Sequence, residues 1–214
     1  AHYSFKDSVG PFKSNTIVKN ETPLLPELKR AAGTPIIVGS LQGRALQLAV
    51  ENGVKDVVVA KHSEGLKKLM LSDEVTLGFV VANMEDLSMQ KKRGEEGFVI
   101  FGNAERVKFN VGKRQSPVNC NLDGAEGLIH IAVSAERNGP KTMYINGVPC
   151  ASLEIAGNVA LNAANNLRIA GNVSIDRIKI WKRSLNPAEA ANLDQARVQE
   201  GDPQGQHGPQ EGGP

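Results

Sequence analysis

Acidic side chains in close pairs are the residues of this sequence that could carry out hydrolytic chemistry. Glu85 is followed directly by Asp86, and Glu95 by Glu96. A retaining glycosidase needs two carboxyl groups about 5 to 5.5 Å apart, and a strand supplies them from alternate positions, which share one face. Adjacent acids in a charged loop diverge instead. We therefore expect a protein that is not an enzyme.

Serine and histidine add little support for catalysis. Ser4, Ser134 and Ser174 lie in predicted strands, and none stands in the Gly-Xaa-Ser-Xaa-Gly turn that exposes a nucleophile. His130 shares a strand face with Ser134, where a structural histidine is favoured over a general base. No Gly-rich loop joins a strand to a helix, so a nucleotide cofactor is not expected.

Aromatic residues can offer flat apolar platforms to sugars, but they make up only 4% of this chain. Four phenylalanines stand in apolar strand patterns and are expected in the core: Phe79, Phe98, Phe101 and Phe109. Trp181 differs, because its strand position matches Arg177 and Lys179 and so points away from the core. Two interpretations of Trp181 are open: it packs beneath a helix or loop, which we favour, or it is a ligand-binding platform.

The last predicted strand leads into a short helix. Ile178 and Ile180 alternate with charged residues, a period-two pattern that indicates a sheet with one buried face. Asn186 can then cap a helix, with Pro187 at its first position and Glu189 three residues after the cap.

Strand signals recur along the whole chain, with little helical pattern between them. The predicted strands cover residues 2–6, 45–50, 54–60, 75–82, 98–101, 107–111, 128–134, 142–145, 153–155, 167–170 and 174–182. A short helix is expected over residues 63–70, and the proline-bearing segment 12–38 is expected to be mostly loop. This pattern predicts an all-β fold of two packed antiparallel sheets.

Four segments, in order, resemble the laminin G-like jelly roll of the concanavalin A-like lectin/glucanase superfamily. They are similar to the family's early strand, its central strand, its Asn-Gly hairpin and its closing strand: Gly43–Leu46, Leu128–Ser134, Met143–Gly147 and Ile175–Glu189. The resemblance implies a two-sheet antiparallel jelly-roll sandwich with one short C-terminal helix. The family's glucanases carry a Glu-Xaa-Asp-Xaa-Xaa-Glu run, which this chain lacks.

The resemblance also implies a place for a metal ion. In this fold the first and last strands are antiparallel neighbours, which would bring Asp7 near Asp176. Asp176 shares the buried face with Ile178, and a carboxylate there must be paired, hydrogen-bonded or bound to metal. Two carboxylates with backbone carbonyls would suit Ca²⁺. The family's Asp-rich loop is missing from residues 7–38, so we favour the alternative of a structural aspartate without metal.

The two cysteines, Cys120 and Cys150, are too far apart in sequence for a CxxC redox or zinc motif. A disulfide between them and two buried thiols are both open.

The charge balance excludes several classes of partner. The net charge is only +2, which gives no long-range field for nucleic acid or an anionic membrane. The basic run 91–93 is followed at once by acids, so we expect a solvated loop there. No segment is apolar over the length that a membrane span requires, so membrane insertion is not expected.

One domain is expected over residues 1–200, since a chain of 214 residues suits a single β-sandwich. Residues 201–214 contain Gly, Pro, Gln and Glu without an aliphatic or aromatic side chain, which predicts a flexible tail or linker. The start at Ala1 suits either a mature secreted protein or a domain cut from a longer one.

These features together predict a non-catalytic, secreted or cell-surface module that recognises a glycan or an extracellular protein through rim loops of the sandwich. The alternative is a structural or adhesion domain whose partner is a protein, and a glycoside hydrolase is less expected.

Overall fold

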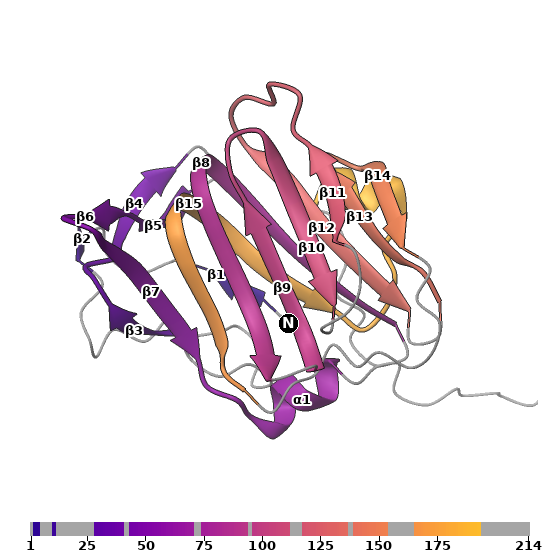
Figure 1. Ribbon diagram of the computed structural model, residues 1–214, viewed down its shortest axis with the longest axis horizontal. Helices are drawn as coiled ribbons and strands as arrows, with labels where there is room; N and C mark the ends of the chain where they lie inside the picture. The colour runs from indigo at the N-terminus through magenta and orange to yellow at the C-terminus, as the bar shows by residue number, and fades with distance from the viewer. Residues whose placement is uncertain are drawn as a thin grey trace, which may run out of the picture.

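Two long strands, β8 (Glu74–Arg93) and β15 (Leu167–Trp181), organise the fold, because each contributes to both of its sheets. They run antiparallel side by side over most of their length, with Phe79 opposite Ile178 and Met89 opposite Ile169. In the computed structural model, each strand passes from one layer of a sandwich to the other (Figure 1). The structure describes residues 2–4, 10–11, 28–40, 43–70, 74–93, 96–111, 117–136, 139–153 and 165–193.

We call the two layers the front sheet and the back sheet. The front sheet has the order β3 (Leu28–Ala32), β7 (Val54–Ala60), first half of β15, second half of β8, β9 (Glu96–Gly102), β10 (Arg106–Val111) and β11 (Val118–Asn121). The back sheet has the order β1 (His2–Ser4), second half of β15, first half of β8, β12 (Ile129–Glu136), β13 (Lys141–Ile145) and β14 (Val148–Leu153). Figure 1 shows the front sheet towards the viewer.

The remaining elements lie at the margins. Strands β5 (Gly43–Leu48), β4 (Ile36–Ser40) and β2 (Gly10–Pro11) extend from the middle of β15, and β6 (Val50–Glu51) forms a hairpin with β7. Helix α1 (Glu64–Met70) lies at one end of the sandwich (Figure 1), and α2 (Pro187–Ala191) follows β15. The predicted all-β sandwich is therefore confirmed.

Both long strands bend where they change layer. Asn83 in β8 has a positive φ of 49°, and the register of β15 shifts between Asn172 and Ser174. Gly171, with φ 151°, lies at this corner, where a Cβ would collide with the backbone carbonyl of Asp86. Only glycine combines this φ with such a close approach of two backbones.

The core lies between the sheets and is built by the alternation that the sequence shows. Phe79, Phe109, Ile178 and Ile180 are at most 1% exposed and belong to one apolar cluster. The helix prediction is also confirmed, because Asn186 and Glu189 form a capping box at the start of α2.

Several predictions for individual segments are wrong. Part of the expected loop 12–38 forms β3 and β4, whose Leu28 and Ile37 reach the core. The basic run 91–93 is not a solvated loop but the end of β8, and the Lys91 side chain is fully buried. Phe101, expected in the core, is 49% exposed. The expected tail 201–214 lies outside the described residues.

Candidate functional site

A hollow of about 370 Å³ opens on the outer face of the front sheet, where β8, β9 and β10 run side by side. We call it the Phe101 hollow. Six residues line it: Asp86, Phe101, Gly102, Asn103, Arg106 and Lys108. An aromatic ring, an amide and charged groups of both signs therefore meet at one surface site.

The Phe101 ring faces solvent because of its position in β9. Phe98 and Ile100 point into the core from the same strand, so the alternation of a strand sends Phe101 to the opposite face. There Phe101 stands directly between Ser88 of β8 and Lys108 of β10. Side chains that face each other in this way have Cβ atoms about 4.5 to 5.5 Å apart, so Lys108 stands beside the ring.

The turn between β9 and β10 fixes the far wall of the hollow. The Asn103 side-chain oxygen accepts hydrogen bonds from the backbone N–H groups of Glu105 (3.0 Å) and Arg106 (2.9 Å). The Asn103 backbone N–H also donates to the Arg106 carbonyl at 3.0 Å. These bonds hold a tight turn, and Arg106, which is exposed, begins β10 at a defined position.

The opposite wall carries the acid Asp86, and its chain neighbour Glu85 lines the second hollow described below; both already have partners. Asp86 forms an ion pair with Lys55 of β7 at 2.5 Å, and Glu85 accepts a hydrogen bond from the Asn172 amide at 2.6 Å. The sequence suggested that these two acids lie in a loop, but both lie in strand β8. They bind different partners, so they are not arranged as a pair of catalytic carboxylates. The side chains of Glu95 and Glu96 lie outside the described residues.

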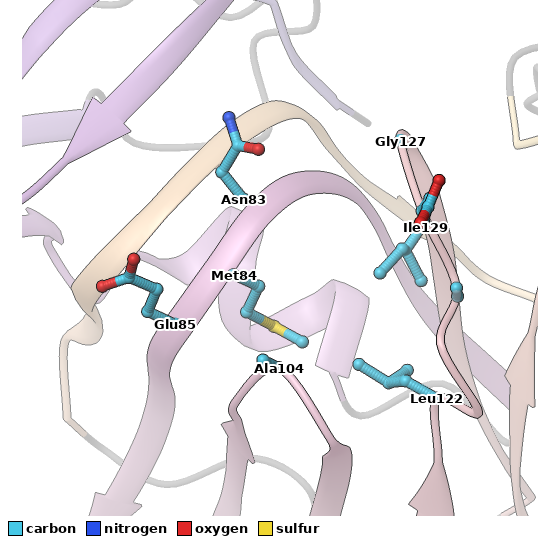
Figure 2. A pocket seen from close by; sticks show the side chains of 9 residues that line it. Asn83, Met84, Glu85, Ala104, Leu122, Gly127 and Ile129 are labelled. Carbon is cyan, nitrogen blue, oxygen red and sulfur yellow. The ribbon is translucent and has the colours of Figure 1, made fainter.

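A second hollow, also of about 370 Å³, lies near the bend of β8. Figure 2 shows the Met84 thioether directed between Ala104, Leu122 and Ile129, while Glu85 points away from them. Gly102, which lines the Phe101 hollow, lies against Met84, which lines the second hollow. A Cβ at Gly102 would lie 2.7 Å from the Met84 sulfur. The second hollow combines apolar side chains with the polar Asn83, Glu85 and Glu126, and unlike the Phe101 hollow it has no aromatic ring.

The structure does not support Trp181 as a ligand platform, since the ring is only 1% exposed. It points away from the main core, as predicted, but α2 and the residues around it cover this outer face of the back sheet. Leu185, Ala190 and Leu193 pack there, and a Cβ at Gly78 would lie 2.7 Å from the ring. The burial of the Trp181 ring therefore favours the first interpretation, in which the ring packs beneath the helix.

Asp176, predicted to point into the sandwich, is 5% exposed. It is the additional residue of a β-bulge, because Ile175 and Arg177 pair with the consecutive residues Val81 and Val80. The predicted pairing of β1 with β15 is present, with Ser4 opposite Arg177. Asp7 lies outside the described residues, and the described part of the chain holds no group of three or more metal-ligating side chains. A calcium site at Asp7 and Asp176 stays a prediction.

Cys120 and Cys150 form a disulfide with a Cα–Cα distance of 5.5 Å. Cys120 belongs to β11 of the front sheet and Cys150 to β14 of the back sheet, so the bond joins the two layers at one edge of the sandwich. Of the two possibilities that the sequence left open, the structure has the disulfide.

A buried lysine and a histidine form a further polar cluster that the sequence did not predict. The Lys91 amine donates to the carbonyl of Asn165 at 2.9 Å and lies 3.1 Å from Nδ1 of His62. Burial lowers the pKa of Lys91 to about 8. Burial, and then the charge of Lys91, lower the pKa of His62. Alternation with Leu87 and Met89, both in the core, was the signal that could have placed Lys91 inside.

No family model matches the chain, and no curated protein matches its sequence. Many solved structures are similar in fold. A structure concerning botulinum neurotoxin type C and its interaction with two ganglioside molecules has a TM-score of 0.66 and 13% identity, over 86% of this chain and 49% of that one. The binding domain of Paraclostridial Mosquitocidal Protein 1 has a TM-score of 0.61 and 14% identity, over 78% and 46%.

A third similar structure is the binding domain of botulinum neurotoxin DC in complex with SialylT, with a TM-score of 0.64 and 12% identity. It is matched over 86% of this chain and 50% of its own length. The chain thus spans about half the length of these neighbours, and at such identity the likeness shows the fold alone: a β-sandwich found in binding domains. Membership of the laminin G-like family stays a prediction. No helix among the described residues is long and apolar enough to cross a membrane.

Proposed function

We propose that this chain is a non-catalytic binding module that recognises a saccharide on the outer face of its front sheet. The observation that carries the proposal is the Phe101 ring, 49% exposed inside a hollow with polar walls. A sugar presents an apolar face to an aromatic ring and hydroxyl groups to neighbouring polar side chains. Asn103 and Asp86 stand where such hydroxyl groups would lie.

The polar groups of the hollow support binding more than catalysis. Hydrolysis of a glycoside needs an acid and a second carboxylate set across the bond that is cleaved. The carboxylate that lines the Phe101 hollow is Asp86, and Lys55 holds it in an ion pair. The solved structures of similar fold are described as binding domains, which agrees with this proposal.

A secreted or cell-surface location belongs to the same proposal. Disulfides persist in oxidising environments and are rare in the cytosol, and the bond between Cys120 and Cys150 joins the two sheets. The laminin G-like motifs of the sequence fit a module of this kind. We keep calcium as a secondary proposal, since the buried carboxylate of Asp176 requires compensation and a metal ion would supply it.

An adhesion domain with a protein partner is the second candidate. Two valines support it, because Val50 and Val54 are 41% and 54% exposed on the hairpin of β6 and β7. Single exposed apolar residues are common on soluble proteins, so this observation is weaker than the aromatic hollow. Capture of a specific extracellular protein that Val50→Ser and Val54→Ser abolish would favour this candidate.

A glycan array with two matched variants tests the saccharide proposal. Phe101→Ala removes the ring, and Val148→Ala removes another exposed apolar side chain, 64% exposed on β14 of the back sheet. We expect wild type and Val148→Ala to retain the same glycans and Phe101→Ala to lose them, with similar melting temperatures for all three. Retention of the same glycans by Phe101→Ala would contradict the proposal.

A further inference from the structure

The positive charges of the Phe101 hollow are concentrated on one wall. Arg106 and Lys108 are two residues apart on β10, so they share the outer face, and both line the hollow. Lys108 stands directly opposite Phe101, and Arg106 follows the tight turn that Asn103 holds. Two cationic side chains therefore start from defined backbone positions next to an exposed ring.

The carboxylate that lines the hollow is engaged elsewhere. Asp86, on the β8 wall of the hollow, is paired with Lys55, and Glu85, which lines the second hollow, accepts a hydrogen bond from Asn172. Glu105 lies in the turn with its side chain exposed, and it is not one of the residues that line the hollow. Within the described part of the chain, no salt bridge joins an acid to Arg106 or Lys108. The two cations are available to an anion that comes from outside.

We propose that the ligand of the Phe101 hollow is an acidic saccharide, whose carboxylate or sulfate group binds Arg106 and Lys108 while a sugar ring stacks on Phe101. This inference rests on the proposed saccharide-binding function and adds the charge of the ligand. Guanidinium and ammonium groups form their strongest hydrogen bonds with such anions. Asn103, on the turn, then contacts a neutral hydroxyl group of the same chain of sugars.

The test is a glycan array that contains carboxylated, sulfated and neutral glycans, followed by titrations with hexagalacturonate, its methyl ester and a heparin hexasaccharide. The methyl ester keeps the sugar backbone and removes the charge. The variant Arg106→Gln/Lys108→Gln removes both cations, and Lys61→Gln/Lys182→Gln removes two exposed cations outside the hollow. Arg106→Lys/Lys108→Arg keeps the charge at the site.

We expect acidic glycans to be retained, and binding to weaken about tenfold for each cation removed from the hollow. The Lys61→Gln/Lys182→Gln control should bind within about threefold of wild type, since screening limits the effect of distant charges. The charge-preserving variant should also bind within about threefold, because it keeps both positive charges in the hollow. Hexagalacturonate carries carboxylates alone and heparin carries both groups, so binding of hexagalacturonate shows that a carboxylate suffices, and binding of heparin alone shows that a sulfate is needed.

The contrary outcomes separate this inference from the proposed function. Acidic glycans that bind Arg106→Gln/Lys108→Gln as well as wild type, or a preference for neutral glycans, would overturn the inference. If neutral glycans still bind and Phe101→Ala abolishes that binding, the saccharide function survives. An array on which no glycan of either kind is retained would overturn both.

Discussion

Raising the pH should stabilise this protein in the window where Lys91 loses its proton. The Lys91 side chain is fully buried, and burial lowers its pKa from 10.5 to about 8. The unfolded chain therefore binds more protons than the folded chain between these two values. Under that condition the free energy of unfolding rises with pH, so stability is gained from about pH 8 upwards and the gain is complete near the unfolded pKa.

The size of the effect follows from the pKa difference. One pKa unit corresponds to about 1.4 kcal/mol, so burying the charged amine costs the fold roughly 3 kcal/mol at neutral pH. Roughly 2 to 3 kcal/mol of this should return between about pH 7 and about pH 10. Urea unfolding at several pH values in this range measures the free energy directly.

The matched control is Lys91→Met, which keeps a long side chain and has no proton to lose. Other lysines and the tyrosines titrate in both proteins, so the difference between the two pH profiles isolates Lys91. We expect the wild type to gain stability relative to Lys91→Met as the pH rises. Parallel profiles for the two proteins would refute the assignment of a lowered pKa to this amine.

Three further predictions concern the sandwich itself. Replacing both Cys120 and Cys150 by serine should lower the free energy of unfolding by about 3 to 4 kcal/mol, from the entropy of the loop that the disulfide closes; equal urea midpoints would show that the bond contributes nothing. Calcium should raise the melting temperature of wild type but not of Asp176→Asn, and identical melts in calcium and in chelator would remove the metal proposal. Ile178→Asp should cost more than about 4 kcal/mol and the exposed Lys182→Asp less than about 1 kcal/mol, and similar losses would contradict the assigned strand faces.

The sequence predicts those parts of the fold where local patterns and tertiary packing agree. Ile178 and Ile180 alternate with charged residues and lie in the core. Asn186 and Glu189 carry the capping signal, and the capping box is present at the start of α2. Alternation with Ile178 also predicted that Asp176 lies on the buried face, and Asp176 is buried. The β-bulge at Asp176 was not predicted, because it leaves no mark in the residue types.

The sequence fails where charge or continuous hydrophobicity hides the strand period. Lys91 stands in a basic run that is typical of solvated loops, yet its strand position directs it inward beside Met89. The run from Phe98 to Phe101 is apolar throughout, so alternation cannot tell which of its side chains faces solvent. Phe101 was therefore missed as a candidate binding residue, and Trp181, which α2 covers, was considered in its place.

The most direct test of the proposed binding site is an NMR titration of ¹⁵N-labelled protein with the glycan that the array retains most strongly. We predict that the amide signals of Ser88, Phe101, Asn103, Arg106 and Lys108 shift together and saturate with one dissociation constant, because these residues surround one hollow. Saturable shifts that cluster on the back sheet, with the signals of the Phe101 hollow unchanged, would contradict the central claim.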